Sequence, residues 1–253
     1  MTRRLEGTVA LVTGASSGIG EATAVALAAE GATVAVAARR RDRLEALVER
    51  IGSDADVLVI ETDITDEASA RAMVEDTVRE FGRLDTVVNN AGVMLLGPIV
   101  DAPVEEWRRM VELNVLGLLY CTHAALPHLL RAAETDPRRV ADVVNVSSVA
   151  GRVARQGSGV YNATKFGVVA FSESLRQEVT RRHVRVSVIE PGAVMTELAS
   201  HNRPEVIENM RANFGQMEMM QSEDIAESIV FTVTRPRHVA VNEILIRPTD
   251  QER

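Results

Sequence analysis

The sequence predicts a single α/β domain built on a doubly wound sheet of about seven parallel strands flanked by helices. Seven short β-branched runs recur along the 253 residues, helical stretches separate them, and no linker rich in Pro or Ser divides the chain. Runs that are apolar almost throughout suit strands buried on both faces, and their alternation with helices implies parallel crossovers. A hydrophobic content of 46% supplies enough apolar material for one large core.

The strands are expected, in chain order, over residues 8–13, 32–38, 56–62, 84–90, 140–147, 184–191 and 242–248. The helix expected over 66–82 has clear end signals, because Asp66 can cap its start and Gly82 can close it. Residues 193–221 break this rhythm and are rich in Met, which is typical of core packing or of an adaptable segment that covers a substrate.

Composition argues against several classes of protein. A net charge of −8 and only eight aromatic residues offer neither a basic surface nor stacking side chains for nucleic acid.

The single cysteine, Cys121, lies in an apolar run and is expected to be buried and inert. The five histidines show no ligand spacing, so no metal is expected. No apolar stretch is expected to reach the roughly 18 residues that a membrane span needs, and the N-terminus is not expected to be a signal peptide. These features predict a soluble, cytoplasmic protein.

A glycine-rich turn, "TGASSGIG" (13–20), follows the first expected strand and leads into a helix. Glycines at 14, 18 and 20 allow a tight turn and a close approach to a pyrophosphate, whose charge would rest on backbone N–H groups at the helix N-terminus. The order of strand, turn and helix within one βαβ unit predicts a dinucleotide site.

Two arginines stand at the end of the second expected strand. Arg39 and Arg40 lie where an acidic residue would hold the ribose 2′-hydroxyl of NAD(H), and two guanidiniums match a 2′-phosphate instead. NADP(H) is therefore the expected cofactor, and Arg39 is favoured over Arg40 as the phosphate ligand. The alternative is a solvated first helical turn capped by Asp42, and Arg41 and Arg43 are expected to be surface residues.

The pair Tyr161 and Lys165 in "YNATK" lies four residues apart, on one face of an expected helix that opens near Ser158. A tyrosine with an ordinary pKa of about 10 needs a neighbouring cation to shuttle protons near neutrality. Taken alone, the pair is also compatible with an exposed amphipathic face.

Six motifs in order now carry a resemblance: "TGASSGIG", "NNAG" (89–92), Asn114, "SS" (147–148), "YNATK" and "PGAVMT" (191–196). The chain resembles the short-chain dehydrogenases/reductases, in particular the NADP-preferring branch of about 250 residues. The resemblance implies one Rossmann-type domain over residues 1–253, hydride transfer with a nicotinamide cofactor, and a homotetramer, with a dimer as the alternative.

The resemblance also implies the catalytic residues. Ser148, 13 residues before Tyr161, would hydrogen-bond the substrate oxygen, and this spacing disfavours Ser147. Tyr161 would exchange the proton, Lys165 would stabilise the phenolate and hold the nicotinamide ribose, and Asn114 would hold a water of a proton relay. The alternatives are a serine that caps a strand end and an asparagine that bonds backbone within its helix.

The cofactor-binding residues expected from the turn, the arginines and the resemblance together are Gly14, Ser16, Ser17, Gly18, Ile19, Gly20, Arg39, Arg40, Asp63, Ile64, Asn90, Ala91, Gly92, Tyr161, Lys165, Pro191, Gly192, Val194 and Thr196. Asp63 and Ile64 would meet the adenine, although Asp63 is alternatively a helix cap. Thr196 would meet the nicotinamide carboxamide or a phosphate.

These residues predict an NADPH-dependent reductase of an aldehyde or ketone. Its small-molecule substrate is a carbonyl compound, or an alcohol if the enzyme works mainly as an alcohol dehydrogenase, because the same residues serve both directions. The alternative from another class is a dinucleotide-binding sensor or scaffold without turnover.

Overall fold

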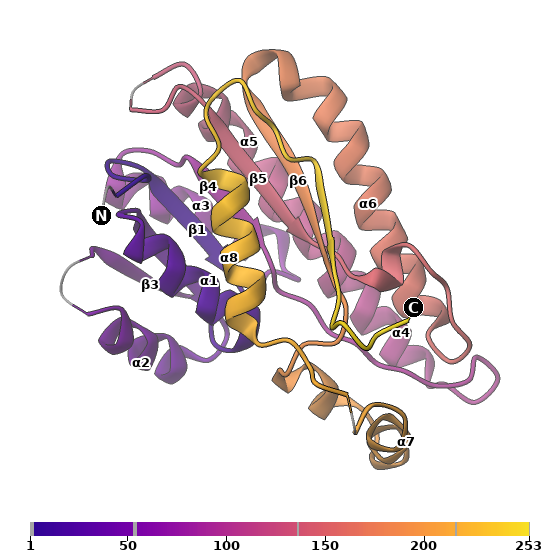
Figure 1. Cartoon of the computed structure of the whole chain (residues 1–253). Coiled ribbons are helices and arrows are strands. Elements are labelled where there is room, and N and C mark those ends of the chain that lie inside the picture. Colours follow the sequence, from indigo (N-terminus) through magenta and orange to yellow (C-terminus); the bar gives the residue numbers. More distant parts are fainter. Residues whose placement is uncertain (1–2, 53–54, 136, 216, 253) are drawn as a thin grey trace.

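In the computed structural model, seven strands form one parallel sheet in the order β3-β2-β1-β4-β5-β6-β7 (Figure 1). The strands are β1 (Val9–Thr13), β2 (Thr33–Ala38), β3 (Val57–Glu61), β4 (Thr86–Asn89), β5 (Ala141–Val146), β6 (Val184–Pro191) and β7 (Glu243–Ile246). All seven expected strands are present, with ends that differ from the expectation by no more than two residues. The sheet order reverses at β1, which pairs with both β2 and β4.

The structure describes residues 3–52, 55–135, 137–215 and 217–252. Positions 1, 2, 53, 54, 136, 216 and 253 of the expected domain, and hence position 216 of the expected substrate-covering segment, lie outside the described residues.

Helices cover both faces of the sheet, as a doubly wound fold requires. The α-helices are α1 (Gly18–Ala29), α2 (Arg41–Ile51), α3 (Glu67–Phe81), α4 (Val104–Val111), α5 (Leu118–Ala132), α6 (Gly159–Val179), α7 (Pro204–Phe214) and α8 (Ser222–Val233). The short helices are η1 (Glu112–Gly117, a π-helix), η2 (Val149–Gly151), η3 (Thr180–Arg182) and η4 (Glu197–His201). Figure 1 shows α7 set apart from the sheet.

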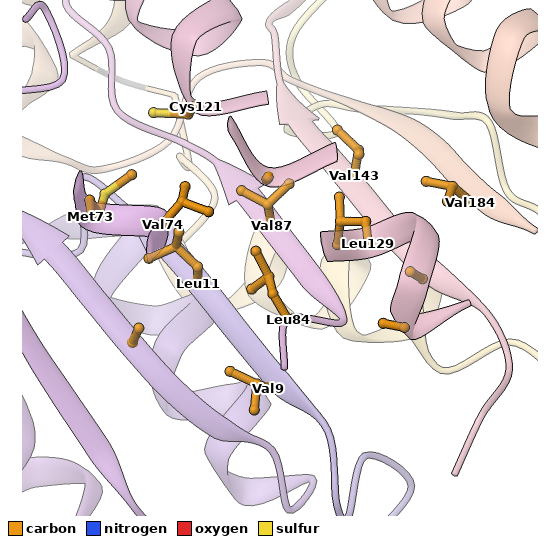
Figure 2. Close-up of a cluster of buried hydrophobic side chains, with 14 of the residues drawn as sticks. Val9, Leu11, Met73, Val74, Leu84, Val87, Cys121, Leu129, Val143 and Val184 are labelled. Atoms are coloured by element: carbon orange, nitrogen blue, oxygen red, sulfur yellow. The ribbon is translucent and has the colours of Figure 1, made fainter. Parts of the chain in front are cut away.

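Each face of the sheet has its own core because successive strand residues point to opposite sides. Leu11 of β1 packs with α3, α5 and α6, whereas its neighbour Val12 packs with α1, α2 and α8. Figure 2 shows the first of these clusters, with Leu11 beside Val74 of α3. Cys121 is fully buried in the same cluster, and burial raises the pKa of its thiol to about 12. The expectation that Cys121 is buried is confirmed, and a thiol with a raised pKa is a poor nucleophile.

The helix caps follow the sequence signals where these are strong. Asp66 accepts a hydrogen bond from the Ser69 backbone N–H at 2.7 Å, and Gly82 ends α3 in the left-handed region with φ of +76°. A glycine adopts this conformation without the strain that a Cβ would cause.

The expectation that no apolar stretch is long enough to span a membrane is wrong for one helix. α4, η1 and α5 run on without a break over Val104–Ala132, 29 residues whose most apolar window has a mean hydropathy of 1.3. This helix is apolar because one side packs against the sheet, where Ala125 and Leu129 are fully buried in the core. One side of this helix therefore belongs to the core, and 39% of its most apolar window is buried.

Candidate active site

The site lies at the carboxyl ends of the strands, where the sheet order reverses between β1 and β4. Ligands of open α/β sheets bind at this point. One cleft there is lined by residues from both halves of the sheet: Gly14, Ser16, Ser17, Gly18, Ile19, Ala37, Ala38, Arg39, Arg40, Thr62, Asp63, Ile64, Asn90, Ala91, Gly92, Val93, Leu113, Val146, Ser147, Ser148, Tyr161, Lys165, Pro191, Gly192, Val194, Thr196, Glu197, Leu198 and His201. The structure thus brings together all the expected site residues except Gly20 and Asn114, which lie just behind the cleft wall.

The glycine-rich turn is held from behind by the end of β4. The Asn90 side chain donates hydrogen bonds to the backbone oxygens of Thr13 and Gly14 at 3.0 and 3.3 Å. A Cβ on Gly14 would lie 2.8 Å from the Cα of Ala91, so only glycine allows the two strand ends to approach this closely. Thr13 adds to this junction, because its hydroxyl accepts from the N–H groups of Asn90 and Ala91.

The N-terminus of α1 fits an anionic group. The first turn of a helix leaves backbone N–H groups without partners inside the helix, and among the described residues the N-cap Ser17 makes no side-chain hydrogen bond to this turn. Gly18 and Ile19 of the turn line the cleft. These donors, together with the helix dipole, suit a pyrophosphate.

Arg40, rather than Arg39, reaches the glycine-rich turn. The Arg40 guanidinium donates to the hydroxyls of Ser16 and Ser17 at 3.0 and 2.9 Å. Arg39 extends the other way, where its side chain is 64% exposed and lies 3.9 Å from the Asp63 carboxylate. Both line the cleft, but Arg40 occupies the position by the turn that sequence reasoning favoured for Arg39.

Asp63 and Ile64 form the wall of the cleft after β3. The Asp63 carboxylate accepts from the backbone N–H and the hydroxyl of Thr65 at 3.0 and 2.8 Å, which orders the turn before α3. The cap of α3 is Asp66, so Asp63 is not the helix cap that its alternative interpretation requires.

Tyr161 and Ser148 meet on the opposite wall. Tyr161 is in the first turn of α6, and its side chain packs with Val93, Leu95 and Met110. Burial raises the pKa of its phenol to about 12, and a hydrogen bond with the Ser148 hydroxyl opposes this rise. The Ser148 hydroxyl also accepts from the Ala150 N–H at 3.1 Å, so this serine both caps η2 and contacts the tyrosine.

Ser147, the competing serine, is directed elsewhere. Its hydroxyl donates to the backbone oxygen of Lys165 at 3.1 Å, and its side chain is buried. The preference for Ser148 over Ser147 agrees with this geometry.

Lys165 is buried beneath Tyr161, one turn further along α6. Its ammonium donates to the Val146 carbonyl at 2.9 Å and lies 5.8 Å from the centre of the Tyr161 ring. Burial lowers the pKa of this ammonium to about 8. Burial, opposed by Ser148, sets the pKa of the phenol, so the lowering of the tyrosine pKa expected from the lysine is not seen here.

Asn114 lies in the π-helical turn η1, which interrupts the long helix at the site. Such turns often mark functional positions. Its amide accepts from the Val93 N–H and donates to the Val93 oxygen, both at 2.8 Å. A Cβ on Gly92 would lie 3.3 Å from the Asn114 oxygen and 3.8 Å from the Lys165 nitrogen, so the glycine lets these two groups approach the same point.

The cleft is closed by the turn after β6. Pro191, Gly192, Val194 and Thr196 all line it, and the Thr196 hydroxyl accepts from the Leu198 N–H at 3.3 Å at the start of η4. Gln251, near the C-terminus, accepts from the Ala193 N–H at 2.8 Å and braces this turn.

Several residues of the site were missed by sequence reasoning. Thr13 is one of them, because the motif alone does not indicate its hydrogen bonds to the end of β4. Arg43 is exposed, as expected, but its ion pair with Glu197 was not predicted. Glu197, Leu198 and His201 were known only as members of a Met-rich segment. These contacts join distant parts of the chain and leave no local pattern.

Comparison with known proteins identifies the family. A family model described as short chain dehydrogenase matches residues 8–206. The chain belongs to this family, and it is therefore an oxidoreductase.

Among curated relatives, the chain is 40% identical to glycine betaine reductase ATRR of Emericella nidulans over 98% of its own length. The chain spans only 19% of that much longer protein. Among solved structures, it is similar to the closed form of serine dehydrogenase complexed with NADP+, with 31% identity, a TM-score of 0.89 and 97% of each chain covered. It is also similar to a 3-ketoacyl-(acyl-carrier-protein) reductase from Brucella melitensis complexed with NADH, with 30% identity, a TM-score of 0.85, and 96% of this chain and 98% of the other covered.

Proposed function

We propose that this oxidoreductase is an NADPH-dependent reductase of aldehydes or ketones. The observation that carries the proposal is the convergence of Ser148, Tyr161 and Lys165 on one wall of a cleft whose other end offers a glycine-rich turn and Arg40. Bound there, the dinucleotide would supply the hydride. The same residues permit the reverse oxidation of an alcohol.

The protein's part in reduction is to polarise the carbonyl and deliver a proton. The Ser148 hydroxyl is close enough to the Tyr161 phenol to oppose the rise in its pKa, so a carbonyl oxygen placed next to both hydroxyls would receive two hydrogen bonds. The phenol, protonated at neutral pH because burial raises its pKa, would give its proton to the developing alkoxide. The Lys165 ammonium would stabilise the phenolate that remains.

Return of the proton requires a path to solvent. We assign this path to Asn114 and Lys165, whose polar groups both approach Gly92. A water between them would carry the proton, in line with the relay that the family resemblance implies.

The cofactor preference rests on Arg40. A guanidinium already aligned by Ser16 and Ser17 suits a 2′-phosphate, and the residues that follow β2 are arginines where an acidic residue would bind a ribose hydroxyl. The solved relatives include one complex with NADP+ and one with NADH. The choice of NADPH for this chain is therefore our proposal.

The substrate class rests partly on a closer resemblance. The stretches "NNAGVMLLGPI" (89–99), "QEVTRRHVRVSVIEPG" (177–192) and "EILIRPTDQ" (243–251) resemble clavulanate dehydrogenase, an NADPH-dependent aldehyde reductase. Residues 197–220 differ from that enzyme, and this region contributes Glu197, Leu198 and His201 to the cleft. We therefore propose the same reaction class and a different carbonyl substrate.

The direct test is NADPH consumption with a panel of aldehydes and ketones, using NADPH deuterated at the transferring carbon. The proposal predicts turnover with at least one carbonyl and deuterium at the carbinol carbon of its product. Binding of NADPH without turnover across the panel would favour the sensor alternative.

Cofactor choice is tested by titrating the wild type, Arg40→Gln and Arg39→Gln with NADPH and NADH. Arg40→Gln should weaken NADPH by about tenfold or more and leave NADH nearly unchanged, since a charge-assisted hydrogen bond contributes about 1.5–3 kcal/mol. The exposed Arg39 should matter less. Equal losses for both cofactors would contradict the assignment.

A further inference from the structure

Glu197 connects the substrate-covering segment to the arginines that face the adenosine side of the cleft. Its carboxylate accepts from Arg40 at 2.9 Å through one oxygen and from Arg43 at 2.6 Å through the other. The two guanidiniums lower the pKa of this carboxyl to about 2, so it is ionised at every physiological pH. Glu197 follows Thr196 directly, at the first residue of η4.

This carboxylate occupies one edge of the Arg40 fork. Nη1 of Arg40 donates to Glu197, while Nε and Nη2 donate to Ser16 and Ser17. The described contacts of Arg40 thus engage every nitrogen of its guanidinium. Arg40 can bind a 2′-phosphate only if the phosphate displaces the Glu197 carboxylate or lies beside it. A phosphate and a carboxylate that share one guanidinium repel each other.

NADH carries a hydroxyl at the same position. This hydroxyl is neutral and does not require the positive charge of Arg40. The ion pairs of Glu197 with Arg40 and Arg43 can therefore persist in the NADH complex. The free energy needed to break the ion pairs of Glu197 therefore lowers the affinity for NADPH and not the affinity for NADH.

We propose that Glu197 is a specificity-determining residue that competes with the 2′-phosphate for Arg40 and Arg43, and so reduces the preference for NADPH over NADH. The inference rests on the proposed NADPH site. It adds that this preference is set by two opposing features, the arginines at the start of α2 and an acidic residue 157 positions further along the chain.

The test measures the dissociation constants of NADPH and NADH for Glu197→Gln, by quenching of protein fluorescence or by calorimetry. Glutamine keeps the size of the side chain and removes its charge. NADPH should bind about three- to fivefold more tightly, since an exposed ion pair contributes up to about a factor of five in affinity. The NADH constant should change by less than about twofold.

Glu205→Gln is the matched control, because Glu205 lies eight residues along the same segment and pairs with Arg203 at 3.0 Å, away from the cleft. It removes the same charge and should leave both constants nearly unchanged. In an Arg40→Gln/Arg43→Gln background, Glu197→Gln should no longer strengthen NADPH.

Three results would overturn the inference: unchanged or weaker NADPH binding by Glu197→Gln, an equal gain for NADH, or a gain that persists without the two arginines. The wild-type titration separates this from the proposed function. If the wild type binds neither dinucleotide, the proposed function itself fails, whereas a wild type that binds both and a silent Glu197→Gln variant refute only the role of Glu197.

Discussion

Tyr161 and Lys165 are both withdrawn from solvent, and burial favours the neutral form of each side chain. The tyrosine pKa rises to about 12 and the lysine pKa falls to about 8. At pH 7 the phenol is therefore protonated and the ammonium is still charged. This is the state that proton donation to a carbonyl requires, with a cation ready to stabilise the phenolate.

The pH dependence of reduction should report Lys165. Its ammonium is present below a pKa of about 8 and is lost as the pH rises above it, whereas Tyr161 keeps its proton up to about 12. We expect the turnover number with NADPH and a carbonyl to fall above pH 8 toward a lower plateau. Steady-state rates between pH 6 and 10 measure this.

Lys165→Arg supplies the comparison, since a guanidinium stays charged over this range. Its rate will be lower if the shape of the site is disturbed, but the decline centred near pH 8 should disappear. A wild-type rate that does not change between pH 7 and 9, or the same decline in Lys165→Arg, would contradict the role of the ammonium.

The two arginines at the end of β2 mark a limit of sequence reasoning. Adjacent residues of an extended chain point to opposite sides, and the sequence does not reveal which side faces the glycine-rich turn. Arg39 and Arg40 were both expected at the cleft, and both line it. Only the folded chain assigns Ser16 and Ser17 to Arg40 and Asp63 to Arg39.

The segment after β6 is tied to the loop after β4 by one buried side chain. Asn202, 8% exposed, accepts from the Leu96 N–H at 2.7 Å and donates to the Met94 oxygen at 2.9 Å. Arg203 adds an ion pair to Glu106 of α4 at 3.1 Å. These contacts fix the segment that carries Leu198 and His201 into the cleft.

Asn202→Ala should loosen this segment, because it leaves the partly buried Leu96 N–H without its partner. An unsatisfied buried group costs about 1–3 kcal/mol, so the KM of the carbonyl substrate should rise by about tenfold. The dissociation constant of NADPH should change little if the main effect is on the substrate side. Steady-state kinetics and a cofactor titration measure the two effects.

Ser200→Ala is the control from the same segment, since the Ser200 hydroxyl bonds only the local Glu197 oxygen among the contacts described. It should leave the KM within about twofold of the wild type. A KM for Asn202→Ala that matches this control would show that the contact does not shape the substrate site.

Regular elements were predictable where local signals are strong. Most strand residues are apolar because helices cover both faces of the sheet, and α3 begins and ends at its predicted capping residues. The π-turn at Asn114 was not predictable, because "ELNVLG" has no signal that separates it from an ordinary helical turn. Its wider hydrogen bonding is a response to tertiary contacts such as those of Asn114 with Val93.

Across the whole molecule, apolar side chains remain exposed along the long helix and its neighbour α6. Val104 is 62% exposed, Val111 41% and Phe166 43%. We propose that these residues contribute to a subunit interface of the homotetramer that the family resemblance implies.

We expect sedimentation or light scattering to give a mass about four times the 27.5 kDa of the chain. Val104→Asp, which places an acidic residue in the first turn of α4 where the helix dipole favours it, should shift the mass to a smaller species without unfolding the chain. A dimer is the retained alternative. A wild-type monomer at micromolar concentration would contradict both.

Contacts between residues that are far apart in the sequence are the part of the site that local sequence patterns do not predict. The parallel topology could be predicted, and with it the meeting of the glycine-rich turn and "NNAG" at one edge of the sheet. The approach of Glu197 to Arg40 and Arg43 depends on how the segment after β6 crosses that edge. The substrate pocket depends on the same crossing, which is why the sequence predicted the reaction class better than the carbonyl compound.

The most direct measurement of the central claim is the reduction rate of Tyr161→Phe at saturating NADPH, with its NADPH dissociation constant measured in parallel. Phenylalanine keeps the buried ring in the cluster with Val93 and Met110 and removes only the proton donor. The account predicts near-normal NADPH binding with a rate reduced by about 10²- to 10⁴-fold, the usual contribution of a general acid. A variant that binds NADPH and keeps more than about a tenth of the wild-type rate would contradict the assignment of Tyr161 as the proton donor.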